Sequence, residues 1–362
     1  MNGQKHQYIE RHTRAVRTER LRGDAFVRAL YSDALERAPW LFRMATSRRL
    51  SSALAFLNYD TFIGARITGT LRFMRECGVN LDECLLPPHS LDTPRKIFER
   101  QIRYRECRPL PLDPSAIVCP ADSRVLVGSL GEASALFIKG KFFDHEELLG
   151  VGRRDWPGAF NGGDFAVFRL TPEKYHYVHA PVSGTVVDFY ELEGRYHSCN
   201  PGALVRTISA HSKNRRSVTI VQTDVEDGSG VGLVAIVEVA ALMIGQVVQC
   251  YSDEEYLSPR AVAPGMYIKR GQPKCLFRPG GSTVVLLFER GRVRFAEDIV
   301  GNLQRRDVHS RFSLGLGQTL VETETAVRSL LATPVNKLAP DDNGRASILE
   351  NRTSQAEVAH VA

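Results

Sequence analysis

The sequence predicts an α+β protein, with a helical N-terminal layer followed by a β-rich domain whose antiparallel strands form a barrel- or sandwich-like core. Between residues 24 and 77, apolar side chains recur at helical spacing. From Ala116 onward, short runs of β-branched and apolar residues alternate with Gly, Pro, Asp or Asn, as in antiparallel sheets. No βαβ rhythm and no Gly-x-Gly-x-x-Gly run is present, which disfavours nucleotide-binding folds.

The composition is that of a soluble globular protein, because 43% of the 362 residues are hydrophobic and 24% are charged. The seven cysteines include no Cys-x-x-Cys pair, which favours a reduced, cytoplasmic setting over a disulfide or zinc scaffold. No apolar run is long enough to span a bilayer, and no signal peptide is visible. The net charge of +6 is matched by the excess of Lys and Arg within residues 1–50, which predicts an acidic partner such as nucleic acid or an anionic membrane surface.

We expect residues 1–23 to form a flexible basic N-terminus and residues 24–112 a helical, membrane-associating region. In the latter, two arginines precede leucines at helical spacing, which fits either a helix packed on the domain or an amphipathic helix at a membrane interface. The basic stretch 95–108 carries aromatic residues, as nucleic-acid-binding segments do, but two glutamates interrupt it. A solvated or phospholipid-facing surface is therefore favoured over a nucleic-acid site.

Residues 113–304 are expected to form the β-rich domain, and residues 305–362 a C-terminal extension with a polar tail. The predicted strands include 117–118, 124–127, 135–138, 165–168, 184–187, 217–222, 232–239, 245–250 and 283–288.

The segment from Phe277 to Phe288 places two glycines and two hydroxyl residues directly before an apolar strand. Glycine lets the backbone at Gly280 and Gly281 bend and be approached closely. Ser282 Oγ could then attack the carbonyl of Gly281 and convert the amide into an ester. Elimination across Ser282 would break the chain and leave a pyruvoyl group. Taken alone, such a tetrapeptide is more often a loop that leads into a strand.

Two histidines follow the predicted strand 165–168. Thr171 is suited to cap a helix and Pro172 to begin one, so we expect a short helical turn there. Three-residue spacing on such a turn would place His176 and His179 on one face, pointing into one cavity. Either one can instead be a structural histidine. No metal site is expected, because no third ligand accompanies the pair.

Asp122 lies in the turn Cys119–Ser123 between two predicted apolar strands. A carboxylate in this position can orient a histidine and stabilise its charged form, as in Ser-His-Asp systems. It is also consistent with an ordinary Asx turn. Because the sequence has no Gly-x-Ser-x-Gly elbow, a hydrolase is not favoured.

Together these motifs resemble the phosphatidylserine decarboxylase proenzymes, in the branch whose cleavage site reads Gly-Gly-Ser-Thr. The resemblance extends, with gaps, from Tyr8 to Ile299. The chain departs from the family pattern at Ser123 and in the stretches 239–245 and 274–279, where usual glycines, a hydroxyl and aromatic residues are replaced. The matching anchors lie within 119–122, 138–150, 168–184, 200–201, 213–216, 280–283 and 295–299.

The resemblance implies that Asp122, His179 and Ser282 form the self-processing triad. Asp122 would orient His179 and stabilise its charge, and His179 would take the proton from Ser282 Oγ. Cleavage between Gly281 and Ser282 would give a β chain of residues 1–281 and an α chain that begins with the pyruvoyl group. This covalent cofactor would form a Schiff base with the substrate amine, and His176 would handle the substrate and deliver a proton.

On this basis we expect a carboxy-lyase that converts phosphatidylserine to phosphatidylethanolamine and CO₂, as a peripheral protein at the cytoplasmic face of the cell membrane. Two alternatives stay open: a related pyruvoyl decarboxylase acting on a soluble amino acid, and a non-processing biotinyl- or lipoyl-like binding protein. Stretches 180–186 and 265–271 resemble the latter, but no modifiable lysine stands at a hairpin tip. The expected partners are anionic membrane lipid and the α and β chains of one proenzyme, with a homodimer left open and nucleic acid excluded.

Overall fold

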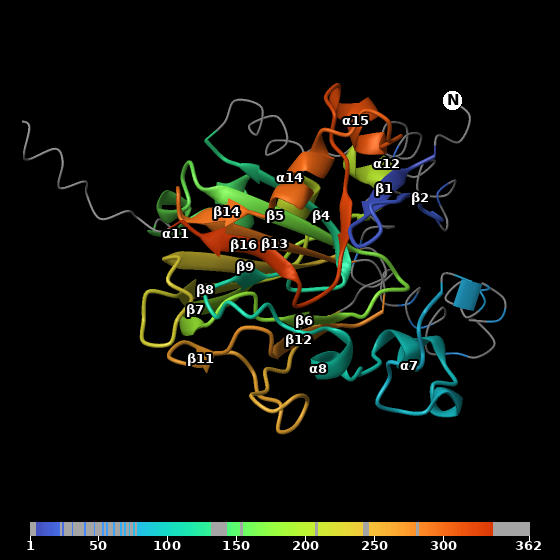
Figure 1. Cartoon of the computed structure of the whole chain (residues 1–362), viewed down its shortest axis with the longest axis horizontal. Helices are drawn as coiled ribbons and strands as arrows, with labels where there is room; N and C mark the ends of the chain where they lie inside the picture. The colour runs from blue at the N-terminus through green and yellow to red at the C-terminus, as the bar shows by residue number, and fades with distance from the viewer. Residues whose placement is uncertain are drawn as a thin grey trace, which may run out of the picture.

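The structure is a computed structural model of the whole chain, shown in Figure 1. The described ranges are 5–21, 78–131, 143–152, 155–206, 209–241, 246–279 and 282–335, together with single positions between 24 and 76. The helical pattern predicted before residue 78, the predicted strand 135–138 and the polar tail from residue 336 onward therefore lie outside the described residues, apart from those single positions.

The main sheet contains ten strands of the described chain, and it is not closed into a barrel (Figure 1). All neighbours in it are antiparallel except β1 and β15, which run parallel. In spatial order the strands are β11 (Tyr267–Ile268), β7 (Gly184–Leu192), β8 (Arg216–Gln222), β9 (Leu233–Ala240), β13 (Ser282–Phe288), β5 (Asp164–Leu170), β4 (Ser123–Ser129), β15 (Thr323–Thr325), β1 (Gln7–Glu10) and β2 (Val16–Thr18).

Two smaller antiparallel sheets accompany the main one within the described residues. The first contains β10 (Val247–Gln249), β12 (Pro273–Phe277) and β6 (Tyr177–His179), in that order. The second contains β14 (Val293–Phe295), β16 (Leu330–Pro334) and β3 (Ile117–Val118). The mixture of antiparallel sheets and short helices confirms the predicted α+β class.

Alternation along β13 divides the core into two layers, because successive side chains of a strand point to opposite faces. Val284 and Leu286 pack on the face covered by the two smaller sheets, where Val178 and Phe277 also lie. Val285 and Leu287 pack on the opposite face, against short helices. These helices are α10 (His145–Leu149), α11 (Asp155–Ala159), α12 (Pro201–Leu204), α13 (Ala210–Lys213) and α15 (Arg311–Leu316).

A third apolar cluster joins the segment before residue 110 to the β6–β12 ladder. Phe98 and Tyr104 are buried in it together with Tyr175 and Leu276. The helices here are short: η3 (Pro88–Ser90), α7 (Pro94–Phe98) and α8 (Tyr104–Cys107). Helix α14 (Glu297–Leu303) packs against β4 and β15 of the main sheet. No helix in the described part of the chain has both the length and the apolar character needed to cross a membrane.

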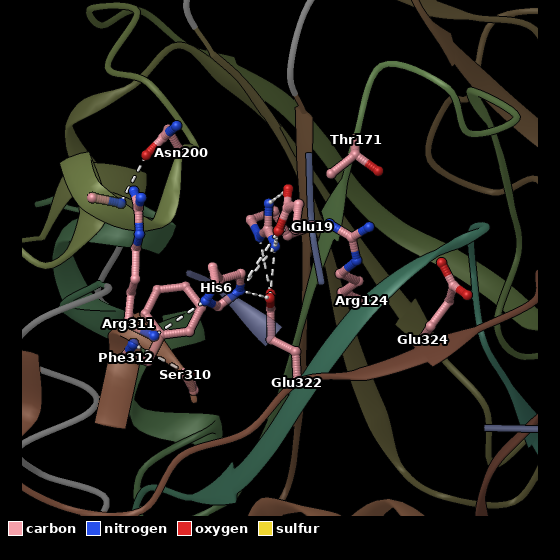
Figure 2. Close-up of polar contacts among 12 residues, drawn as sticks. His6, Glu19, Arg124, Thr171, Asn200, Ser310, Arg311, Phe312, Glu322 and Glu324 are labelled. Carbon is pink, nitrogen blue, oxygen red and sulfur yellow. Dashed lines mark hydrogen bonds and ion pairs between the residues drawn. The ribbon is translucent and has the colours of Figure 1, made fainter. Parts of the chain in front are cut away.

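The N-terminal segment is not the flexible arm that its polar composition predicted. Residues 5–21 contain the hairpin β1–β2, which extends the main sheet at β15. Figure 2 shows His6, Glu19 and Glu322 drawn together by dashed contacts. Arg169 donates to both carboxylates, at 2.7 Å to Glu19 and 2.6 Å to Glu322. This buried ion network holds the hairpin in place, and composition alone does not reveal it.

The same cluster has the ligand types of a metal site, since its His6, Glu19 and Glu322 ligand atoms lie within 4.8 Å of one another. Arg169 and Arg124 neutralise the two carboxylates, because Arg124 Nη1 also forms an ion pair with Glu19 at 2.7 Å. A cation bound there would face two buried guanidinium groups. We therefore interpret the cluster as a structural ion network.

Residues 305–335 are part of the fold, although the sequence predicted an extension from residue 305. β15 lies between β4 and β1 in the main sheet, and β16 is the central strand of the second small sheet. The weak pattern in this region is explained by the shortness of both strands, which are three and five residues long.

Candidate active site

Ser282 is the first residue of β13, in the middle of the main sheet. It pairs with Leu170 of β5 on one side and with Ala240 of β9 on the other. Alternation places its side chain on the face of Val284, toward the smaller sheets. The side chain is fully buried, and Ser282 Oγ has no hydrogen-bond partner among the described residues. A buried unpaired hydroxyl costs stability.

His179 ends β6 and is fully buried. Its Nδ1 lies 2.8 Å from the carbonyl oxygen of Gly271, and its Nε2 lies 3.0 Å from the hydroxyl of Tyr175. Because a carbonyl can only accept, Nδ1 carries a proton. Burial, with a smaller contribution from the nearby Arg328 guanidinium, lowers the pKa of His179 to about 3. His179 is therefore neutral at physiological pH.

Asp122 is buried, and its carboxylate accepts hydrogen bonds from Arg108 at 3.0 and 3.1 Å and from the backbone N–H of Val327 at 2.7 Å. Burial alone would raise the pKa of Asp122, but the charge and hydrogen bonds of Arg108 hold it below its ordinary value. The carboxylate makes no hydrogen bond to His179. The two residues are linked through the backbone, since the N–H of His179 donates to the carbonyl of Pro120 at 2.7 Å.

His176 precedes β6 and is also fully buried. Its Nδ1 donates to the carbonyl of Lys174 at 2.7 Å, and its Nε2 has no partner among the described residues. The ring stacks on Phe98 of α7, with 3.5 Å between ring centroids. Burial, followed by the charge of Arg100, lowers the pKa of His176 well below its ordinary value. The free Nε2 of this neutral ring is a lone pair available to accept a proton.

The predicted helical turn at Thr171 is wrong. The chain makes a single turn, in which the N–H of Lys174 donates to the carbonyl of Thr171, and then continues extended into β6. The β-sheet pairing of β6 with β12 overrides the capping signal of Thr171 and Pro172. As a result the two histidines occupy different surroundings: His176 lies on Phe98, whereas His179 lies edge-on to Tyr104 and beside Tyr175.

The structure connects His176 to the predicted cleavage segment. The backbone N–H of Phe277, at the end of β12, donates to the carbonyl of His176 at 3.1 Å. Five residues later in the sequence the chain reaches Ser282. Gly280 and Gly281 lie outside the described residues.

A buried ion pair lies on the same face of the sheet as Ser282. Glu238 pairs across the ladder with Val284, and Lys274 Nζ lies 2.5 Å from the Glu238 carboxylate. Both side chains are fully buried, and Ser217 donates to the second carboxylate oxygen at 2.9 Å. Lys274 belongs to the stretch in which the sequence departs from the family pattern, but its acidic partner is 36 residues away along the chain. Sequence reasoning missed the pair for this reason.

Sequence reasoning also missed Arg108, Tyr175 and Tyr256. Arg108 ends the basic stretch that was assigned to the surface, yet it is the main partner of Asp122. The two tyrosines bond to each other at 2.7 Å, and Tyr175 contacts His179. Tyr175 stands directly before His176, so its place in the motif was the one available signal.

A buried unpaired serine hydroxyl and two buried neutral histidines, on the main sheet and the small sheet that covers it, form a candidate active site. The sequence profile of the phosphatidylserine decarboxylase family matches residues 95–321. The chain belongs to this family, whose members are carboxy-lyases.

Three relatives show how far the similarity extends. A phosphatidylserine decarboxylase proenzyme of Fusobacterium nucleatum is 26% identical over 316 residues, which cover 87% of this chain and 97% of that protein. A proenzyme of the same name from Chlamydia trachomatis is 32% identical over 248 residues, covering 68% of this chain and 76% of that protein. Phosphatidylserine decarboxylase proenzyme 2 of Oryza sativa is 33% identical over 242 residues, 66% of this chain and 36% of that protein.

Proposed function

We propose that this chain is a proenzyme that cleaves itself between Gly281 and Ser282, and that the processed protein decarboxylates phosphatidylserine. The observation that carries the proposal is the Ser282 hydroxyl, which is buried and unpaired at the start of the central strand β13. The printed names of the relatives support the substrate. The residues around Ser282 fit a pyruvoyl group, because a buried polar atom without a partner stands where that group would form.

Self-cleavage needs a nucleophile and a base. Ser282 Oγ attacks the carbonyl carbon of Gly281, its proton goes to His179, and the peptide bond becomes an ester. Loss of the Ser282 α-proton then expels the Gly281 carboxylate, and hydrolysis of the resulting enamine releases ammonia. Residues 1–281 become the β chain and the rest becomes the α chain, with the pyruvoyl group at its N-terminus.

The surrounding residues divide the remaining work. The Asp122 carboxylate raises the proton affinity of His179 through its charge, as the direction of its effect on the His179 pKa indicates. The free Nε2 of His176 can accept a proton from the incoming substrate amine and deliver it to the substrate carbon after CO₂ leaves. The pyruvoyl carbonyl supplies the electron sink for this decarboxylation.

The basic N-terminal region supports a location at an anionic membrane surface, on the cytoplasmic side, with the protein bound peripherally.

Vesicles that contain phosphatidylserine are the first substrate to test, and free serine is the second. We expect CO₂ release from the vesicles and none from the Ser282→Ala variant. Release from free serine alone would instead support a decarboxylase of soluble amino acids.

The two histidines are expected to fail at different steps. His179→Ala removes the proposed base, so the chain stays uncleaved. His176→Ala leaves cleavage intact and lowers decarboxylation by roughly 100-fold or more, the usual contribution of a general acid. Gel analysis measures the first effect and CO₂ release the second. Loss of cleavage in both variants, with both folded, contradicts the division of roles.

A further inference from the structure

A row of three hydrogen bonds leads away from His179 through two tyrosine hydroxyls. His179 Nε2 lies 3.0 Å from the hydroxyl of Tyr175, which lies 2.7 Å from the hydroxyl of Tyr256. The Tyr256 hydroxyl in turn lies 3.0 Å from the carbonyl oxygen of Ile102 and 3.1 Å from its N–H. The Tyr175 ring is fully buried, and the row joins β6, the loop after β10 and the segment before α8.

Counting protons shows that this row has two complete arrangements. His179 Nδ1 must donate to Gly271, and each tyrosine hydroxyl has one proton to give. In the inward arrangement Tyr256 donates to Tyr175, and Tyr175 donates to the bare Nε2 of a neutral His179. In the outward arrangement Tyr175 donates to Tyr256, and Tyr256 donates to the carbonyl of Ile102. His179 Nε2 then faces an oxygen lone pair and is complete only when it carries a proton.

Both arrangements keep the same atoms in place, because only two O–H bonds rotate between them. The N–H of Ile102 donates to Tyr256 in either one. A buried polar group without a partner costs free energy, and neither charge state of His179 leaves such a group in this row. In the outward arrangement the Tyr175 oxygen accepts from Nε2 of the imidazolium, and the carbonyl of Gly271 accepts from Nδ1.

We propose that Tyr175 and Tyr256 are positioning residues whose hydroxyls reverse direction when His179 takes up a proton. This inference rests on the proposed function, in which the proton leaves Ser282 Oγ. The proton binds at Nε2, Tyr175 turns its O–H from His179 to Tyr256, and Tyr256 turns its O–H to Ile102. No covalent bond of either tyrosine forms or breaks, and the proton is the only group that moves between residues.

Two opposing charges act on His179. The Arg328 guanidinium donates to the same Gly271 carbonyl at 3.1 Å and lies over the Tyr104 ring, so it opposes a positive ring. The Asp122 carboxylate favours a positive ring, but it is paired with Arg108. Tyr175 bonds to Nε2 directly, and Tyr256 reaches Nε2 through the hydroxyl of Tyr175.

The first test measures the rate of self-cleavage in freshly synthesised full-length chain. Tyr175→Phe and Tyr256→Phe keep the rings and remove one hydroxyl each, and each is expected to slow cleavage roughly 10- to 100-fold, the effect of losing a hydrogen bond to a charged group. Tyr177→Phe is the matched control, since Tyr177 stacks on Tyr175 but its hydroxyl bonds to Gln101. A Tyr256→Phe rate equal to that of the unchanged chain overturns the proposal, even if Tyr175→Phe is slow.

The second test does not depend on cleavage. In the uncleavable Ser282→Ala chain, the ¹⁵N resonance of His179 Nε2 reports whether that nitrogen accepts a hydrogen bond. We expect Tyr175→Phe, which removes the hydroxyl that bonds to Nε2, to shift this resonance, and Tyr177→Phe to leave it in place. An unchanged resonance in Tyr175→Phe contradicts the hydroxyl row. Failure of the unchanged chain to cleave contradicts the proposed function, while this measurement still decides on the row.

Discussion

At the scale of single residues, the site contains both unpaired and fully paired buried polar atoms. Ser282 Oγ and His176 Nε2 have no partner among the described residues, whereas Lys274 and Glu238 on the same side of the sheet satisfy each other. A buried polar atom without a partner costs free energy, and this cost is removed when a reacting group bonds to it. A closed ion pair offers no such vacancy, so we assign it a structural role.

Acid is expected to destabilise the chain well before its carboxylates titrate. Burial lowers the pKa of His179 to about 3 and that of His176 well below the ordinary 6.5. Below pH 6.5 the unfolded chain therefore binds more protons than the folded one, and stability falls as pH falls. Each histidine contributes roughly 1.4 kcal/mol per pH unit across this window. Thermal unfolding of the Ser282→Ala chain between pH 7 and 5 measures the effect.

Two comparisons identify the source of this loss. His176→Gln should flatten the dependence of the unfolding temperature on pH, whereas replacement of the exposed His12 by Gln should not. The lowered pKa of Asp122 also contributes, but its part is lost only below about pH 4, since the ordinary value is 3.8. An unfolding temperature that stays constant from pH 7 to 5 would show that the histidines are not buried as neutral rings.

At the scale of elements, the strand pattern was readable from sequence and the connections were not. The predicted strands at 165–168, 217–222 and 283–288 are confirmed by β5, β8 and β13, because each is buried on both faces and so consists of apolar and β-branched residues. The turn at Thr171 was mistaken for a helix, since its capping signal is local while the pairing of β6 with β12 is not. Asp122 and His179 were located by motif, but Val327 and Gly271, which bond to them, lie 205 and 92 residues away in sequence.

The hairpin β1–β2 should depend on its buried ion network. Arg169→Met leaves Glu19 and Glu322 buried without their shared partner, which is expected to cost roughly 3–5 kcal/mol of unfolding free energy. Urea unfolding of the Ser282→Ala chain measures this cost. Arg17→Met is the matched control, because Arg17 pairs with Glu10 on the exposed side of the same hairpin and should cost at most about 1 kcal/mol. Equal costs for the two variants would contradict the network's role.

At the scale of the whole molecule, the chain brings together residues from its two ends and its middle. β15, from the C-terminal part, joins β4 to the N-terminal hairpin, and Val327 after it donates to Asp122. The sequence could not reveal this, because residues 323–325 are too short a strand to show a period. Membership of the phosphatidylserine decarboxylase family was readable from the ordered motifs, and the match over residues 95–321 confirms it.

The central claim is that Ser282 is the point at which this chain cuts itself, and the intact mass of the purified protein under denaturing conditions tests it most directly. We predict two fragments that meet between Gly281 and Ser282, the smaller with a blocked N-terminus that has lost ammonia relative to serine. The Ser282→Ala chain should remain whole. A single 40.3 kDa species from the folded, unchanged chain would contradict the account.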